Sequence, residues 1–158
     1  MKSRVIDNFI NDLITFLDGK FSNDDRIPKS KKLQGQLAFT KKMIQETTKS
    51  FYVVSCLNNS PESETFNGVT TLRVNIQIDA FALAGTFDNK QYLPDRMAMM
   101  LQETISGYME DLKFGDENKN IILMREITSS PSLPFENGDR AYFSSLRYQF
   151  TIMRDYVS

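Results

Sequence analysis

The sequence predicts an α+β fold: a largely antiparallel four-stranded sheet with two main helices on one face. Three observations support this. The segments 69–83 and 140–156 alternate apolar and polar residues with a period of two, as half-buried strands do. The segments 3–18 and 94–115 place apolar residues at helical spacing. Because each long strand has a single apolar face, both helices are expected to cover the same side of the sheet.

The elements are expected in the order helix, strand, strand, helix, strand, strand. The first helix has Ser3 as its predicted N-cap and Gly19 as its predicted stop. The short apolar run 51–57 predicts a buried strand. The polar, turn-rich segment 58–68 that follows it predicts a hairpin loop.

The second half of the chain begins with the second helix, which Pro94 starts and which should end near Gly115. Gly107 inside this helix costs about 1 kcal/mol relative to alanine, so a close backbone contact is expected there. A third strand is predicted over 121–127. The final strand, 140–156, is about three times the usual length of about 5 or 6 residues. We therefore expect it to project beyond its own sheet.

The two long strands share a repeated residue pattern, which we call the internal echo. Residues 71–78 and 145–152 both read hydroxyl, Leu, Arg, apolar, amide, apolar, polar, Ile, at an offset of 74 positions (145 − 71). An ancient duplication would explain this echo and would give pseudo-two-fold packing of the sheet. Convergence of two amphipathic strands on one pattern explains it equally well.

The composition argues against most kinds of active site. The 158 residues include no His, no Trp and one Cys, so the commonest acid–base, metal-ligand and nucleophile–base combinations are missing. Cys56 lies in an apolar run and is expected to be a buried structural thiol. Glu103, Glu110 and Asp111 are candidate carboxylates, but they fall on the solvent side of a helix, without a Gly-rich phosphate loop. We expect no enzyme, no cofactor and no metal.

No targeting or membrane segment is expected. The N-terminus is a charged start of an amphipathic helix, and no apolar stretch approaches the roughly 18 residues of a membrane span. With 41% hydrophobic residues, residues 1–158 are expected to form one domain with its own core, and the protein is expected to be cytosolic where it is made.

The net charge of −1 is unevenly distributed. The segment 19–50 holds eight basic and three acidic residues (8 − 3 = +5), so the rest carries −6 (−1 − 5). Its lysines Lys29, Lys31 and Lys32 are candidates for contact with an acidic partner or with nucleic acid. Few aromatic residues are present to stack on bases, and a solvated connector is an equally good interpretation. The part 37–47 is compatible with a short helix.

The polar faces of the long strands suggest contacts between subunits. Arg73 and Arg147 lie on these faces, either solvated or paired with acids of a neighbour. The Ser/Pro loop 129–138 contains Leu133 and Phe135, which either form a docking surface or pack back onto the domain. A long edge strand can extend the sheet of a neighbour, and a heterologous contact of this kind can close a ring.

Four stretches occur in a characteristic order: 74–81 (VNIQIDAF), 125–134 (REITSSPSLP), Gly138, and Tyr142 with 146–152 (LRYQFTI). With the helices between them, they resemble the tail-terminator family of long-tailed bacteriophages. The same group includes minor capsid and tail-to-head joining proteins. No single stretch is highly specific, and the resemblance rests on their order.

This resemblance implies a structural virion protein that forms a homohexameric ring. The ring would cap the tail tube, stop its polymerisation and join it to the head connector or stopper, and DNA would pass through it without sequence recognition. No membrane is implied. The basic segment 19–50 is longer than expected for a compact member, so another neck, connector or baseplate adaptor ring, or the tube cap of a toxin-delivery system, remains an alternative. A small hydrolase or transferase is a third possibility.

Overall fold

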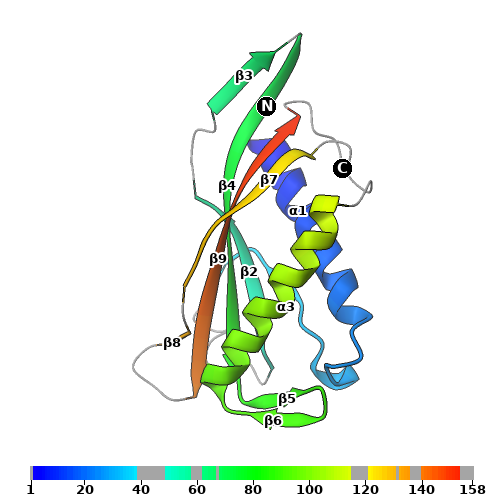
Figure 1. Ribbon diagram of the computed structural model, residues 1–158, viewed down its shortest axis with the longest axis vertical. Coiled ribbons are helices and arrows are strands. Elements are labelled where there is room, and N and C mark those ends of the chain that lie inside the picture. Colours follow the sequence, from blue (N-terminus) through cyan, green and yellow to red (C-terminus); the bar gives the residue numbers. More distant parts are fainter. Residues whose placement is uncertain are drawn as a thin grey trace.

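The computed structural model describes residues 2–38, 49–57, 62–66, 68–114, 121–130, 132–135 and 140–153. It shows an α+β protein in which two helices lie on one side of a mixed sheet (Figure 1). The helices are α1 (Lys2–Ser22) and α3 (Pro94–Phe114). The sheet contains β1 (Gly35–Gln36), β2 (Phe51–Cys56), β3 (Glu62–Phe66), β4 (Val69–Leu83), β7 (Ile121–Ser129), β8 (Leu133–Pro134) and β9 (Ala141–Met153). A separate hairpin is formed by β5 (Gly85–Phe87) and β6 (Lys90–Tyr92).

The four expected strands lie side by side in the order β2-β4-β9-β7, with β7 at one edge of the sheet. The fold class and the two helices are thereby confirmed, but the expected total of four strands is too low. Three short strands extend the sheet: β3 and β8 pair antiparallel with β4 and β9, whereas β1 pairs parallel with β2. The segment 58–68 is therefore not simply a loop, because 62–66 folds back along β4 as a strand.

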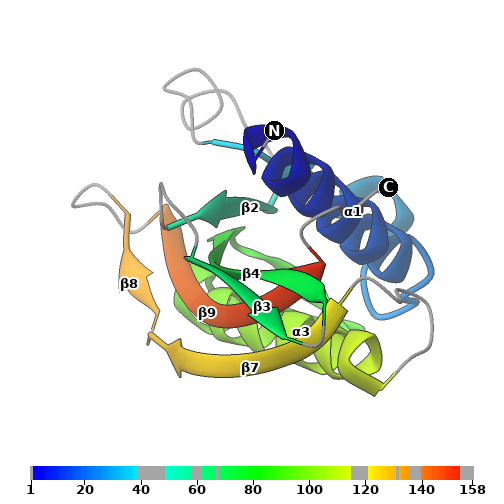
Figure 2. The same ribbon diagram turned by 90° about the horizontal axis from the view of Figure 1, so that it is seen from above.

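The final strand does not project from the sheet. β9 pairs with β4 from Ala141–Leu83 to Met153–Thr71, and its other side pairs with β7 and β8. The predicted projecting edge strand is therefore wrong for 141–153, because the equally long β4 accompanies it; residues 154–156 lie outside the described part. Figure 1 shows that the β3–β4 hairpin extends beyond the end of the sheet instead. Figure 2 shows how strongly β7 and β9 curve.

The pairing register of the long strands follows the internal echo. Asn75 lies opposite Gln149, and these residues are 74 positions apart, as the echo requires. A local two-fold axis therefore passes between them and relates Arg73 to Arg147. The order β2-β4-β9-β7 is the arrangement that an internal duplication predicts.

The core lies between the sheet and the two helices. Eight even-numbered side chains of the long strands face the helices and are at most 2% exposed: Leu72, Val74, Ile76, Ile78, Leu146, Tyr148, Phe150 and Ile152. The helices contribute Phe9, Leu13, Leu17, Phe21, Met97, Leu101, Ile105 and Met109. The Phe9 and Phe150 rings meet edge to face, with centroids 4.8 Å apart. The predicted inward faces are confirmed.

α1 continues past Gly19, its predicted stop. Phe21 lies four residues after Leu17 and prolongs the buried stripe of the helix, so another turn gains core contacts. Its ring centroid lies 5.6 Å from that of Tyr52 and 5.0 Å from that of Tyr108. Burial of this aromatic residue outweighs the tendency of an exposed glycine to end the helix.

A hydrogen-bonded cluster joins α1 to the first two strands. The buried Tyr52 hydroxyl proton is shared between Asp18 Oδ1, at 2.7 Å, and the Ile14 carbonyl oxygen, at 3.0 Å. The Gly35 amide also donates to Asp18 Oδ1, at 2.8 Å. A Cβ atom at Gly35 would lie 2.7 Å from Ile14 and Tyr52, so the site requires glycine. Sequence analysis did not identify Gly35, because the contact forms only on folding.

Two local expectations are wrong. No atom outside the α3 backbone lies within 4 Å of a Cβ built at the exposed Gly107, so the described chain supplies no close contact there. Cys56, at the end of β2, is half-buried rather than buried.

Of the segment 37–47, residues 37 and 38 are not helical and the remainder lies outside the described residues. Of the helices that the structure describes, none is long and apolar enough to cross a membrane.

Candidate interaction surfaces

The sheet face opposite the helices carries the odd-numbered residues of β4 and β9. We call it the open face, because no helix packs over it within the described residues. In Figure 1 the two helices lie to the right of the sheet and β8 lies to its left. The open face is defined by Arg73, Asn75, Gln77, Asp79, Leu123, Arg125, Ser145, Arg147, Gln149 and Thr151.

One hydrogen-bonded network on the open face surrounds Asp79, which is 8% exposed. Arg147 Nε donates to Gln77 Oε1 at 2.9 Å. Gln77 Nε2 donates to both carboxylate oxygens of Asp79, at 2.9 and 3.1 Å, and the Ser145 hydroxyl also donates to Asp79. A nearly buried carboxylate must be hydrogen-bonded to donors. Because Gln77 donates to Asp79 and accepts from Arg147, the same network holds the Arg147 side chain in place.

A second polar row crosses three strands. Arg125 Nη2 donates to Gln149 Oε1 at 3.1 Å, and Gln149 Nε2 lies 3.4 Å from its acceptor, Asn75 Oδ1. Side chains that are already held lose less conformational freedom when a partner binds. The two networks therefore prepare Arg125 and Arg147 for contact.

The open face is cationic. Arg73, Arg125 and Arg147 are all exposed and occupy successive rows of the sheet, opposite Thr151, Gln149 and Gln77 respectively. On β4, β7 and β9 the described acidic side chain of this face is Asp79, which is nearly buried. Arg73 and Thr71 pair in register with Glu62 and Glu64 of β3, so the cationic part of the open face is the part that carries Arg125 and Arg147. Leu123, in the Arg73 row, is 59% exposed and adds an apolar contact area.

A hollow on the open face brings together two of the predicted interface residues, Arg147 and Leu133. Its lining is formed by Gln77, Thr128, Ser129, Ser130, Leu133, Phe143, Ser145 and Arg147. Leu133 is 45% exposed. Gln102 Nε2 of α3 donates to the carbonyl oxygens of Ser130 and Ser145, at 2.7 and 2.9 Å, which holds the wall of the hollow to the helical layer.

Phe135, the other apolar residue of the predicted loop, packs back onto the domain. It is half-buried, and its ring meets Phe81 and Phe143 edge to face, with centroids 5.4 and 6.0 Å away. It covers a small apolar cluster at one end of the open face, formed by Phe51, Val53, Phe81, Leu83 and Ala141. Of the two alternatives that the sequence left open, Phe135 therefore packs back onto the domain, whereas Leu133 stays exposed and available for docking.

The predicted lysines lie elsewhere, on the segment that leaves α1. Lys29 and Lys31 are exposed on a short 3₁₀ helix, Lys29–Lys31. Lys32 is half-buried, and its ammonium group donates to the carbonyl oxygen of Asp24. The segment is not only a solvated connector, because its Ile27 and Leu33 are both 2% exposed and belong to the core.

An ion pair fixes the start of this segment. Arg26 donates from Nε and Nη2 to the two Asp24 carboxylate oxygens, at 2.9 and 2.7 Å, and the Tyr108 hydroxyl also donates to Asp24. The Arg26 hydrogen bonds, with a smaller contribution from Tyr108, hold the pKa of Asp24 well below its ordinary value of 3.8. Arg26 also lies over the Phe87 ring, 4.9 Å from its centroid. The segment is thereby attached to α3 and to the β5–β6 hairpin.

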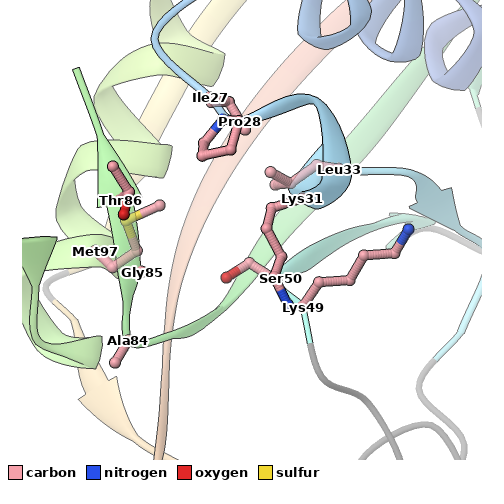
Figure 3. Close-up of a pocket in the computed structure, with 10 residues that line it drawn as sticks. All are labelled: Ile27, Pro28, Lys31, Leu33, Lys49, Ser50, Ala84, Gly85, Thr86 and Met97. Carbon is pink, nitrogen blue, oxygen red and sulfur yellow. The ribbon is translucent and has the colours of Figure 1, made fainter. Parts of the chain in front are cut away.

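A pocket of about 110 Å³ lies beneath this segment (Figure 3). A dry cavity of roughly 150 Å³ can hold benzene, so this one has room for a single aliphatic side chain. Its lining is formed by Ile27, Pro28, Lys31, Leu33, Lys49, Ser50, Ala84, Gly85, Thr86 and Met97. Of the three predicted lysines, Lys31 lines the pocket.

The candidate carboxylates of α3 lie on its exposed side, as predicted. Asp111 forms an ion pair with Lys20 of α1, with 2.9 Å between Lys20 Nζ and Asp111 Oδ2. Glu103 and Glu110 are exposed and make no hydrogen bond or ion pair within the described chain. No group of three or more acidic or cysteine side chains among the described residues is arranged to hold a metal ion.

No protein-family model matches this chain, and a search of the curated proteins found no significant match.

Proposed function

We propose that this chain is a structural subunit of a ring in the tail or neck of a long-tailed bacteriophage, with the tail-terminator role that the sequence resemblance implies. The observation that carries the proposal is the open face. Its Arg125 and Arg147 are exposed yet held by hydrogen bonds across three strands, which is the preorganisation that a recurring protein contact needs.

A ring subunit must present two different surfaces, one to each neighbour. The open face supplies one of these surfaces, and the helical layer on the opposite side of the sheet supplies a second. In the tail-terminator role the assembled ring caps the tail tube and stops its polymerisation. Its other side meets the head connector or stopper, and DNA passes through the central hole.

The β3–β4 hairpin is suited to contact a different ring of the same particle. It extends beyond the sheet (Figure 1), and Gly68 at its turn has a φ of +80°, which favours glycine. A hairpin that reaches past its own domain can touch the tube or the connector without disturbing the contacts between subunits.

A second candidate is a connector or baseplate adaptor ring. The pocket beneath the basic segment favours it, because an apolar lining with Lys31 and Lys49 beside it fits an acidic partner segment that carries an aliphatic side chain. Both candidates predict self-association, and they differ in the partner that the ring meets.

Native mass spectrometry and negative-stain microscopy of the purified protein and of assembled particles test the proposal. We expect rings, six-fold for a tail terminator, at high protein concentration or on a tail-tube template. A protein that is strictly monomeric in solution and absent from any six-fold ring in particles contradicts the tail-terminator role. Rings of another order, located away from the tube end, favour the adaptor role.

A further inference from the structure

We propose that the open face of one copy packs against the outer stripe of α3 on the next copy in the ring. This inference rests on the proposed ring function and names the surfaces that form it. The α3 stripe consists of Glu103, Gly107 and Glu110, which are all exposed and follow one another along the helix at intervals of four and three residues.

The two surfaces have opposite charges. The open face presents Arg125 and Arg147, and the two Nη groups of Arg147 have no hydrogen-bond partner in the described chain. The α3 stripe presents Glu103 and Glu110, which have neither a hydrogen bond nor an ion pair within the same described part. Each surface therefore offers the groups that the other one lacks.

The acidic character of the helical side extends to β7. The pKa of Tyr148, which lies on the helix-covered face, is raised to about 12, chiefly by burial and in addition by the carboxylates of Glu126 and Glu110. Both carboxylates therefore place negative charge on the same side of the sheet. The arginines face the opposite side.

The spacing of the charges also matches. Glu103 and Glu110 are seven residues apart, or about 10 Å along a helix that rises about 1.5 Å per residue. Arg147 and Arg125 lie on neighbouring strands, in rows two residues apart along β9, so their backbone positions are about 8 Å apart at about 3.3 Å per residue and about 4.8 Å between strands. A helix that lies roughly along the strands can thus place both glutamates over arginines of the open face.

Gly107 gives this stripe a shape that a partner can use. It lies between the two glutamates, and a Cβ built there would meet no atom outside the helix backbone within 4 Å. A glycine inside an exposed helix reduces helix stability, and no contact within the described chain accounts for it. Its missing side chain allows the surface of a neighbouring copy to approach the helix backbone closely.

The two surfaces lie on opposite sides of one sheet, so their contact is heterologous. Each copy uses its open face toward one neighbour and its α3 stripe toward the other. Repetition of such a contact closes into a ring when the rotation between copies allows it. The occupant of the open face is therefore a second copy of this chain.

Two complementary charge-reversal variants test the pairing. The first is Arg125→Glu with Arg147→Glu, and the second is Glu103→Arg with Glu110→Arg. Each variant alone places like charges at every contact, so we expect ring formation to fall at least tenfold. In a 1:1 mixture the copies alternate and every contact again joins opposite charges, so we expect rings of even order to return. Native mass spectrometry provides the readout, because the two variants differ in mass.

Matched controls are Lys90→Glu and Asp25→Arg, which reverse exposed charges on the β5–β6 hairpin and on the segment after α1. We expect both to form rings like the wild type. Rings that persist in the first two variants overturn the proposed contact and leave the ring function standing. Variants that lose the ring and fail to recover on mixing show that the two surfaces do not meet each other. A wild type that never forms a ring overturns the ring function together with this contact.

Discussion

Phe150 and Gln149 are adjacent residues with opposite environments. Phe150 is fully buried against Phe9, whereas Gln149 bridges Arg125 and Asn75 on the open face. We expect Phe150→Ala to lower the free energy of unfolding by about 3–5 kcal/mol, through lost burial and the cavity left behind. Gln149→Ala should cost about 1 kcal/mol or less, because it removes neutral hydrogen bonds near solvent. Chemical denaturation measures both, and equal losses would contradict the assigned faces.

Asp24 should make the stability of the protein sensitive to acid. Because hydrogen bonds from Arg26, and secondarily Tyr108, lower its folded-state pKa, its contribution is present in full above the ordinary value of 3.8. It is lost progressively as the pH falls below that value toward the lower folded-state pKa. We expect Asp24→Asn to destabilise the protein by about 1–3 kcal/mol at neutral pH.

The difference in unfolding free energy between wild type and Asp24→Asn should narrow as the pH falls below 3.8. Denaturation curves at several pH values measure this difference. Asp25→Asn is the matched control, because Asp25 is exposed and adjacent in sequence. A difference that stays constant down to pH 2 would show that the Asp24 ion pair does not contribute through its charge.

At the scale of the elements, α3 begins at a proline and contains a glycine that lowers its helix stability. Pro94 begins the helix as predicted, and Gly107 lies exposed within it without a contact in the described chain. We expect Gly107→Ala to raise the free energy of unfolding by about 1 kcal/mol. The same methyl group should weaken ring formation, if the ring uses this stripe.

Denaturation and native mass spectrometry of the same Gly107→Ala preparation separate the two effects. Gly19→Ala is a useful control, because Gly19 is also exposed within a helix with open space around it. We expect Gly19→Ala to stabilise the fold and to leave ring formation unchanged. Equal effects of both substitutions on the ring would contradict a specific role for Gly107.

The existence and the inward faces of the strands were easier to predict than the strands that pair with them. The alternation in 69–83 and 141–153 sets their inward faces through the period of two, a property of the chain alone. The pairing of a strand depends on segments far away in the sequence. For this reason β9 was predicted to be an edge strand, whereas it lies between β4 and β7 inside the sheet. The β5–β6 hairpin was missed, although Asp88 and Asn89 at its turn, with φ of 52° and 65°, are residues that favour such turns.

At the scale of the whole molecule, the basic segment provides a further test. Lys29 and Lys31 are exposed, while Lys32 holds the carbonyl oxygen of Asp24. For the proposed ring, we expect the triple Lys→Glu variant at these positions to impair the joining of heads to tails, because a ring multiplies the local charge by its number of subunits. The defect should grow at low ionic strength, where the Debye length exceeds about 8 Å.

Complementation of a phage that lacks this gene, with joined particles counted by microscopy, measures the effect. The double variant Lys29→Glu with Lys31→Glu is the control that leaves the Lys32 hydrogen bond intact, and it should show most of the defect. A defect confined to the triple variant would trace to local unfolding around Asp24. Normal numbers of infectious particles would show that the three lysines take no part in joining heads to tails.

The sequence alone determined the α+β class, the two helices, the four main strands and the inward faces of the longest two. These features follow from local periodicity, which each segment carries by itself. It also singled out Arg147 and Leu133 separately, without indicating that they share one hollow. Tertiary structure alone decided which strands are edges, because pairing joins residues 74 positions apart, as in Asn75 and Gln149. It likewise decided that the arginines and α3 lie on opposite sides of the sheet, since the side on which a helix packs is set by burial of the whole core.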